Sequence, residues 1–71
     1  MTNNTTMANI DRAVVLLEDM IAKENDTQRK YAMLAARDHM KYAWAYLNHN
    51  RNDEAGRYLE AAKKIIKGLV A

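Results

Sequence analysis

The amino-acid sequence predicts an all-α protein, a small three-helix up-down-up bundle that forms a single domain. The 71 residues include no Pro and two Gly, and 49% are hydrophobic, many of them Ala, which favours long helices over a sheet rich in turns. In three segments, apolar residues recur at the three- and four-residue spacing of one helical face. Short polar stretches separate these segments, so neighbouring helices are expected to run antiparallel.

The first helix is predicted from about residue 7 to residue 24. Its buried face is formed by a stripe of apolar residues at helical spacing: Ile10, Val14, Leu17 and Ile21. Thr6 and Asn9 are the candidate caps of its N-terminus. Residues 1–6 are polar and uncharged, so we expect a short disordered lead there and no signal peptide.

The second and third helices are predicted over residues 28–49 and 52–69. Asp26 or Thr27 supplies the cap of the second helix, and Asn52 starts the third. The second helix is apolar over more than half of its circumference, so it must touch two neighbours or a partner chain. The third has one apolar and one charged face, which is typical of a helix packed on one side.

Residues 39–67 resemble a single tetratricopeptide-type helical hairpin. Small, aromatic, turn and large apolar residues stand at the offsets of that repeat: Ala43, Tyr46, Asn50, Ala55, Leu59 and Ala62. His39 and Lys67 depart from the pattern, because the family often has Trp and Pro there, and Asn50 replaces the usual Gly. The resemblance implies small residues where the two helices cross, a left-handed residue at the corner, and protein or peptide binding.

Side chains that carry chemistry are scarce in this chain. Cys and Ser are absent, and no Gly-rich phosphate loop is present. His39 and His49 are ten residues apart, whereas a metal site within one helix needs partners three or four residues apart. We expect His39 to be a packed structural residue and His49 to sit at a helix C-terminus. The sequence therefore predicts no enzyme, no metal site and no cofactor.

Charge and hydropathy indicate in which compartment the chain is expected to reside. The net charge of +2 is small, with a mildly acidic first segment and mildly basic second and third segments. No apolar run approaches the ~20 residues that span a bilayer, so no membrane association is expected. The lack of Cys agrees with a reducing compartment, and we expect a cytoplasmic protein.

Trp44 is the foremost candidate for binding a partner. It lies at the edge of the apolar arc of the second helix, beside Arg37 and Lys41, and Trp and Arg are enriched at interface hot spots. Met33 and Met40 extend this candidate surface. The alternative is that Trp44 packs in the core with the two methionines.

The preferred function is a non-catalytic protein-interaction module: an adaptor, a regulator or a small inhibitor of the phage type. A homodimer is expected to cover the surplus apolar surface of the second helix.

Nucleic-acid binding is the alternative function. It would use a basic face on the second and third helices, whose main residues are Arg57, Lys63, Lys64 and Lys67. Asp53, Glu54 and Glu60 dilute this charge, and Glu60 is spaced to pair with the lysines that follow it.

Val15 is an apolar residue that falls on the polar side of the first predicted helix. A lone exposed valine needs no explanation. Together with Ala8 and Ala22, however, it forms a small candidate contact patch.

Overall fold

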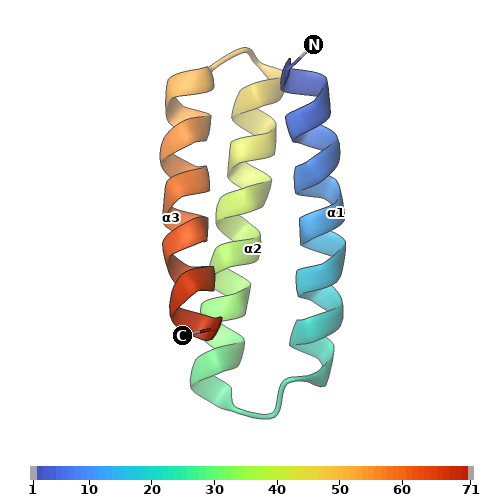
Figure 1. The fold of residues 1–71 in the computed structure, drawn as a ribbon, viewed down its shortest axis with the longest axis vertical. Helices are drawn as coiled ribbons and strands as arrows, with labels where there is room; N and C mark the ends of the chain where they lie inside the picture. Colours follow the sequence, from blue (N-terminus) through green and yellow to red (C-terminus); the bar gives the residue numbers. More distant parts are fainter. Residues whose placement is uncertain (1, 71) are drawn as a thin grey trace.

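The computed structural model describes residues 2–70, which form three α-helices and no strand. The helices are α1 (Thr2–Lys23), α2 (Thr27–Asn48) and α3 (Asn52–Val70), and they run up, down and up in a body of 37 × 19 × 17 Å (Figure 1). The predicted three-helix up-down-up fold is confirmed. The ends of α2 and α3 lie within one residue of the expected positions.

The N-terminal part of α1 differs from the prediction. Helix α1 begins at Thr2, so the expected disordered lead over residues 1–6 is wrong for residues 2–6, and Met1 lies outside the described residues. Each residue added to an existing helix gains one hydrogen bond, so Thr and Asn can extend a helix that packing has already nucleated. Thr6 and Asn9 therefore lie within α1 and do not cap it. Asn9 instead accepts a hydrogen bond of 2.7 Å from Arg12 through its side-chain oxygen.

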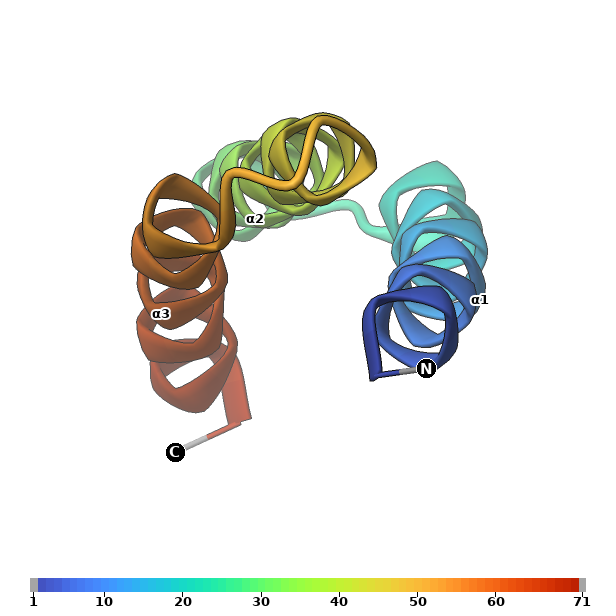
Figure 2. The ribbon, with the colours of Figure 1, turned by 90° about the horizontal axis from the view of Figure 1, so that it is seen from above.

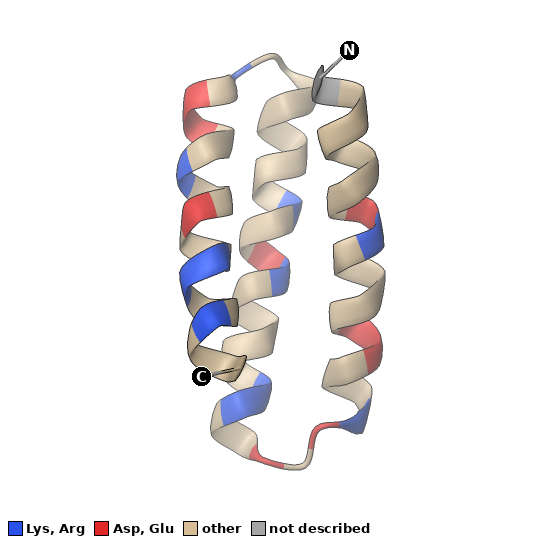
Figure 3. Ribbon diagram, in the orientation of Figure 1, with Lys and Arg blue, Asp and Glu red and all other residues tan. Residues whose placement is uncertain are grey.

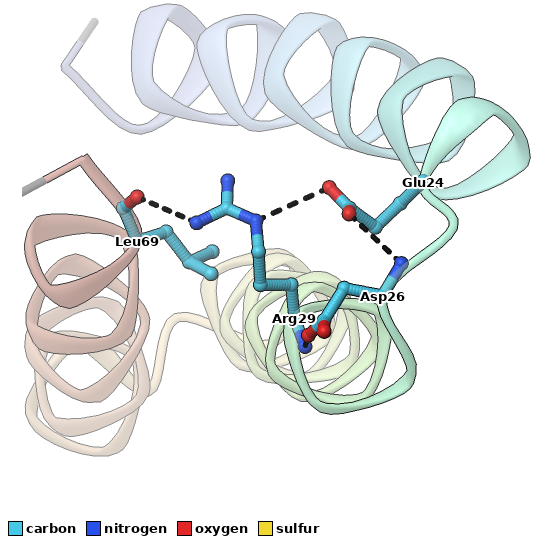
Figure 4. A network of polar contacts seen from close by, with 4 residues as sticks. All are labelled: Glu24, Asp26, Arg29 and Leu69. Carbon is cyan, nitrogen blue, oxygen red and sulfur yellow. Dashed lines mark hydrogen bonds and ion pairs between the residues drawn. The ribbon is translucent and has the colours of Figure 1, made fainter.

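A polar network holds the α1–α2 connection against the end of α3 (Figure 4). Asp26 caps α2, and its Oδ2 accepts a 2.9 Å hydrogen bond from the backbone N–H of Arg29. The guanidinium of Arg29 then donates from Nε to Glu24 over 3.3 Å and from Nη1 to the carbonyl of Leu69 over 3.0 Å. A cation at the C-terminal end of a helix is favoured by the helix dipole. Arg29 thus ties the ends of α1 and α3 to α2.

The α2–α3 turn is closed by backbone hydrogen bonds around a left-handed residue. Asn50 has φ 59°, the conformation expected at this corner, and asparagine is one of the few residues that tolerate it. The N–H of Asn50 donates to the carbonyl of Leu47 over 3.0 Å, and the N–H of Arg51 donates to that of Tyr46 over 2.8 Å. This pair of bonds is the Schellman motif, which satisfies carbonyls that the helix end leaves open.

Small residues allow α2 and α3 to approach closely. Ala36 and Ala43 of α2 are 0% exposed, as is Ala62 of α3, and Ala55 is 1% exposed. Because alanine adds one methyl group beyond the backbone, two helices that meet at alanines can pack nearly backbone to backbone. Larger side chains of α3, Leu59 and Ile66 among them, surround this contact and are half-buried.

Helix α1 packs on the other side of α2, and within residues 2–70 it does not pack against α3. Viewed from above, the three helices form a U with α2 at its base (Figure 2). Ile10 and Leu17 of α1 join the core. The described core consists of nine buried apolar side chains: Ile10, Leu17, Met33, Ala36, Met40, Ala43, Leu47, Ala55 and Ala62. The wide apolar arc of α2 is therefore covered in part by two neighbouring helices, one of the outcomes that its width predicted, whereas Tyr31 and Tyr42 on its flank stay exposed.

Enlarging an alanine at the α2–α3 contact should destabilise the protein. We expect Ala43→Leu or Ala55→Leu to lower the free energy of unfolding by about 1–3 kcal/mol, because a buried methyl group has no room for three more carbons. Chemical denaturation followed by circular dichroism measures this change. Ala45→Leu is the matched control, since Ala45 is exposed on α2. Equal stability of all three variants would contradict the packing described here.

Candidate interaction surfaces

Trp44 lies in the seam between α1 and α2. The residue is half-buried and packs against the core. It lines a surface hollow of about 260 Å³ together with Ile10, Asp11, Val14 and Lys41. Its indole N–H is buried and meets no acceptor among the described residues. Of the two alternatives for Trp44, this position favours the packing role, because most of the ring serves to hold α1 on α2.

Arg37 and Lys41 lie beside Trp44 but are engaged with α1. Both approach Glu18, with nitrogen–oxygen distances of 4.0 Å for Arg37 and 3.9 Å for Lys41. Arg37 also binds Asp38 at 3.0 Å, and its side chain is 25% exposed. Exposed ion pairs contribute little stability, roughly 0–1 kcal/mol each. They do show, however, that these two cations face an acidic residue of the same chain.

Met33 and Met40 are 2% and 8% exposed, so the expectation that they contact a partner is corrected. Both belong to the buried core to which all three helices contribute. A helical wheel shows that these residues share an apolar arc with Trp44. It does not show which part of the arc a neighbouring helix will cover.

Aromatic rings gather on the seam between α2 and α3, on a surface that we call the tyrosine face: His39, Tyr42, Tyr46 and Tyr58. Tyr58 is at the centre, with its ring centroid 5.8 Å from that of His39, 5.4 Å from that of Tyr42 and 5.5 Å from that of Tyr46. The planes of Tyr46 and Tyr58 are 15° apart, a stacked pair. These distances lie in the favourable range for aromatic pairs.

The tyrosine face combines rigid rings with exposed ones. Tyr42 is 55% exposed. Tyr31, eleven residues earlier on nearly the same side of α2, is 67% exposed and extends the tyrosine face along α2. His39, as expected, is a partly buried, packed residue. Its Nδ1 is buried, and no partner for it is found among the described residues. The sequence contained a signal for this cluster, because residues 39, 42 and 46 share one flank of a helix. Only the folded hairpin brings Tyr58 against them.

Arg51 and Glu54 border the tyrosine face at the α2–α3 turn. The guanidinium of Arg51 lies 5.4 Å from the ring centroid of Tyr46 and binds Glu54 at 2.6 Å. A hollow of about 360 Å³ continues from there, and its walls include Glu54, Arg57 and the rings of three aromatic residues. The side-chain hydrogen bond from Arg51 is the main reason why the pKa of Glu54 is lowered from its ordinary value of 4.5.

Acidic residues interrupt the basic face that was predicted on α3. Basic and acidic residues follow one another along α3 (Figure 3). Arg57 and Lys64 share a hollow with Asp53 and Glu60. Lys63 lies 3.8 Å from Glu60. Lys67, with Lys63 and Lys64, lines a second hollow near the end of α3. Nucleic-acid sites usually carry a denser and less interrupted positive patch, so this arrangement gives little support to the nucleic-acid alternative.

The outward side of α1 exposes large apolar residues. Val15 is 65% exposed, Leu16 is 64% exposed and Met20 is 44% exposed. Val15 and Leu16 line a shallow hollow of about 380 Å³ with Asp11 and Arg12. The expected patch of Val15 with Ala8 and Ala22 is thus exposed, and Leu16 adds more apolar surface than either alanine.

Comparison with models of protein families, with curated proteins and with solved structures gives no match. Within residues 2–70, no group of three or more His, Cys, Asp or Glu side chains is arranged to hold a metal ion. None of the helices described here combines the length and the apolar character that crossing a lipid bilayer requires.

Two substitutions of Trp44 should separate the packing of its ring from the cost of its buried, unpaired indole N–H. We expect Trp44→Ala to lower the free energy of unfolding by about 2–4 kcal/mol, because it opens the α1–α2 seam. Trp44→Phe should cost far less, since it keeps an aromatic ring and removes a buried N–H that has no acceptor. Thermal and chemical denaturation measure both. A Trp44→Ala variant as stable as the wild type would contradict the packing role.

The pKa of Glu54 should depend on Arg51. Because the folded-state pKa is lowered, the pair stabilises the fold above pH 4.5, and its contribution is lost as the pH falls through the folded-state value. We expect Arg51→Ala to raise the pKa of Glu54 towards 4.5, as measured by NMR titration of the carboxyl carbon. Arg57→Ala is the control, because Arg57 contributes the weakest of the interactions that lower this pKa. An unchanged pKa in Arg51→Ala would contradict the hydrogen bond.

Proposed function

We propose that this chain is a non-catalytic protein-interaction module of the cytoplasm, an adaptor or small regulator, that binds its partner protein through the tyrosine face. The observation that carries the proposal is the exposure of Tyr42 on top of packed rings. Tyr and Arg are enriched among the residues that dominate binding energy at protein interfaces.

The rings of the tyrosine face are held in place before a partner arrives. Tyr46 stacks on Tyr58, and Tyr58 in turn contacts Tyr42. Side chains that are already fixed lose little conformational entropy on binding, so more of the contact energy remains as affinity. Tyrosine also offers an apolar ring and a hydroxyl group together. The partner surface that fits is apolar, with hydrogen-bond acceptors or donors at its edge.

Two further features support this proposal. Tyr31 and Tyr42 both remain more than half exposed on nearly the same side of α2, so the exposed surface extends along α2 beyond the ring contact of Tyr42 with Tyr58. The same hairpin, residues 39–67, is the segment that resembles a tetratricopeptide-type repeat, a class of repeat that binds proteins and peptides. The Trp44 seam is less suited to a partner, because the ring already packs α1 on α2.

Loss of the exposed tyrosines should reduce partner binding without unfolding the protein. We expect the double variant Tyr31→Ala/Tyr42→Ala to capture its partner at least about tenfold less well than the wild type, a loss of about 1.4 kcal/mol or more. Affinity-tagged protein in a lysate of the source organism, with quantitative mass spectrometry, measures the capture. Circular dichroism should show the same fold, since both side chains are mostly exposed.

Val70→Ala is the matched control, because Val70 is 77% exposed on α3 and away from the tyrosine face. Its capture should equal that of the wild type. Equal capture by the double variant and the wild type would contradict the proposal. A nucleic acid recovered in place of a protein, with binding that weakens steeply as salt rises, would favour the alternative function.

A further inference from the structure

The outward side of α1, opposite the core residues Ile10 and Leu17, carries a row of exposed residues. We call it the α1 strip: Ala8, Arg12, Val15, Leu16, Asp19 and Lys23. Arg12 and Asp19 are seven residues apart and therefore nearly aligned along the helix. Val15 and Leu16 lie between them in sequence, one on each side of this line. The strip thus has an apolar centre with a cation on one side and an anion on the other.

We infer that the α1 strip binds a second copy of this chain, with the two α1 helices antiparallel. A two-fold axis that passes between Val15 and Leu16 places Arg12 opposite Asp19 of the partner subunit. Symmetry then repeats the pair at the other end, so one contact contains two ion pairs. An isologous interface must be complementary to itself. A cation and an anion at equal distances from an apolar centre satisfy this condition, because the two-fold axis brings each opposite the other.

The apolar residues fit the same axis. Near a two-fold axis each residue meets its own copy, so Leu16 packs against the partner's Leu16, and Val15 packs against the partner's Val15. The shallow hollow beside Val15 and Leu16 leaves room for the facing side chains. Lys23 comes to lie near Ala8 of the partner subunit, where it meets no like charge.

The parallel alternative is disfavoured by charge. If the two α1 helices ran in the same direction, Arg12 would face the partner's Arg12, and Asp19 would face the partner's Asp19. Like charges across an interface are costly, whereas opposite charges set the register. In the single chain, Arg12 is bonded to Asn9 and Asp19 to Lys23 at 3.0 Å, and both pairs are exposed. Each partner therefore keeps hydrogen-bonding capacity for a further contact.

The length of α1 is sufficient for such an interface. A stable interface buries about 800 Å² on each partner, which is roughly a sixth of the 5038 Å² that this chain exposes. Val15 and Leu16 alone are too small for that. Side-by-side contact along the strip extends over about 22 Å, since its ends are 15 residues apart at about 1.5 Å rise each.

This inference goes beyond the proposed partner site, because it uses no residue of the tyrosine face. It also relocates the expected homodimer from α2, whose buried apolar residues pack within the chain, to α1. Either idea can fail while the other stands, since their variants lie on different helices and have different readouts.

A charge-exchange experiment tests the pairing. The wild type should form a dimer in sedimentation equilibrium as its concentration rises from micromolar to millimolar. Arg12→Asp and Asp19→Arg should each weaken the dimer about tenfold or more, because each places like charges opposite one another twice. The double variant Arg12→Asp/Asp19→Arg should restore it. Leu16→Asp should abolish the dimer, and Val70→Ala should leave it unchanged.

Cross-linking tests the register independently, and it is simple because the chain has no cysteine. Val15→Cys should form a disulfide-linked dimer on oxidation, because position 15 lies next to the two-fold axis. Ala8→Cys should not, since its two copies are about 22 Å apart in the antiparallel arrangement. A monomeric wild type at all concentrations would overturn the inference. So would a dimer that survives Leu16→Asp, or efficient cross-linking through Ala8→Cys.

Discussion

The contact of α2 with α3 at buried alanines determines where the rest of the chain can lie. Ala36, Ala43, Ala55 and Ala62 bring the two helices close, and the Schellman turn at Asn50 fixes how the chain enters α3. With α3 on one side of α2, the remaining apolar residues of α2 leave a single place for α1. Met33, Met40 and Leu47 are then buried in the core that all three helices share. The consequence for function is that the buried part of α2 is used within the chain. Surfaces for other molecules must use its exposed flank, which carries Tyr31 and Tyr42, or another helix.

The fold was largely predictable from the sequence because it depends on local features. Helical periodicity, the cap at Asp26 and the left-handed corner at Asn50 each act over a few residues, and each occurs where it was expected. The start of α1 was not predictable in this way. Thr and Asn weakly disfavour helix, and the gain of extending an existing helix is not visible in residue types.

The candidate site was less predictable because it depends on which helices become neighbours. A wheel places Trp44, Met33 and Met40 on one arc but does not say where α1 will lie. Likewise, Arg37 and Lys41 form a basic strip on α2 alone, yet Glu18 of α1 faces both. Tyr58 and Tyr42 are sixteen residues apart and meet only when the hairpin closes. Pairs that form between helices are the part of a surface that a single helix does not reveal.

The chain carries two candidate surfaces on different parts of the U that its helices form. The α1 strip lies on one arm of the U, whereas the tyrosine face lies where its base meets the other arm (Figure 2). A two-fold dimer through α1 would therefore leave the tyrosine faces of both copies uncovered. Two identical sites on one rigid particle can bind a repeated or dimeric partner with an avidity well above the affinity of one site. The two surfaces share no residue, so a chain as short as this one could pair with itself through α1 and still bind a partner through the tyrosine face.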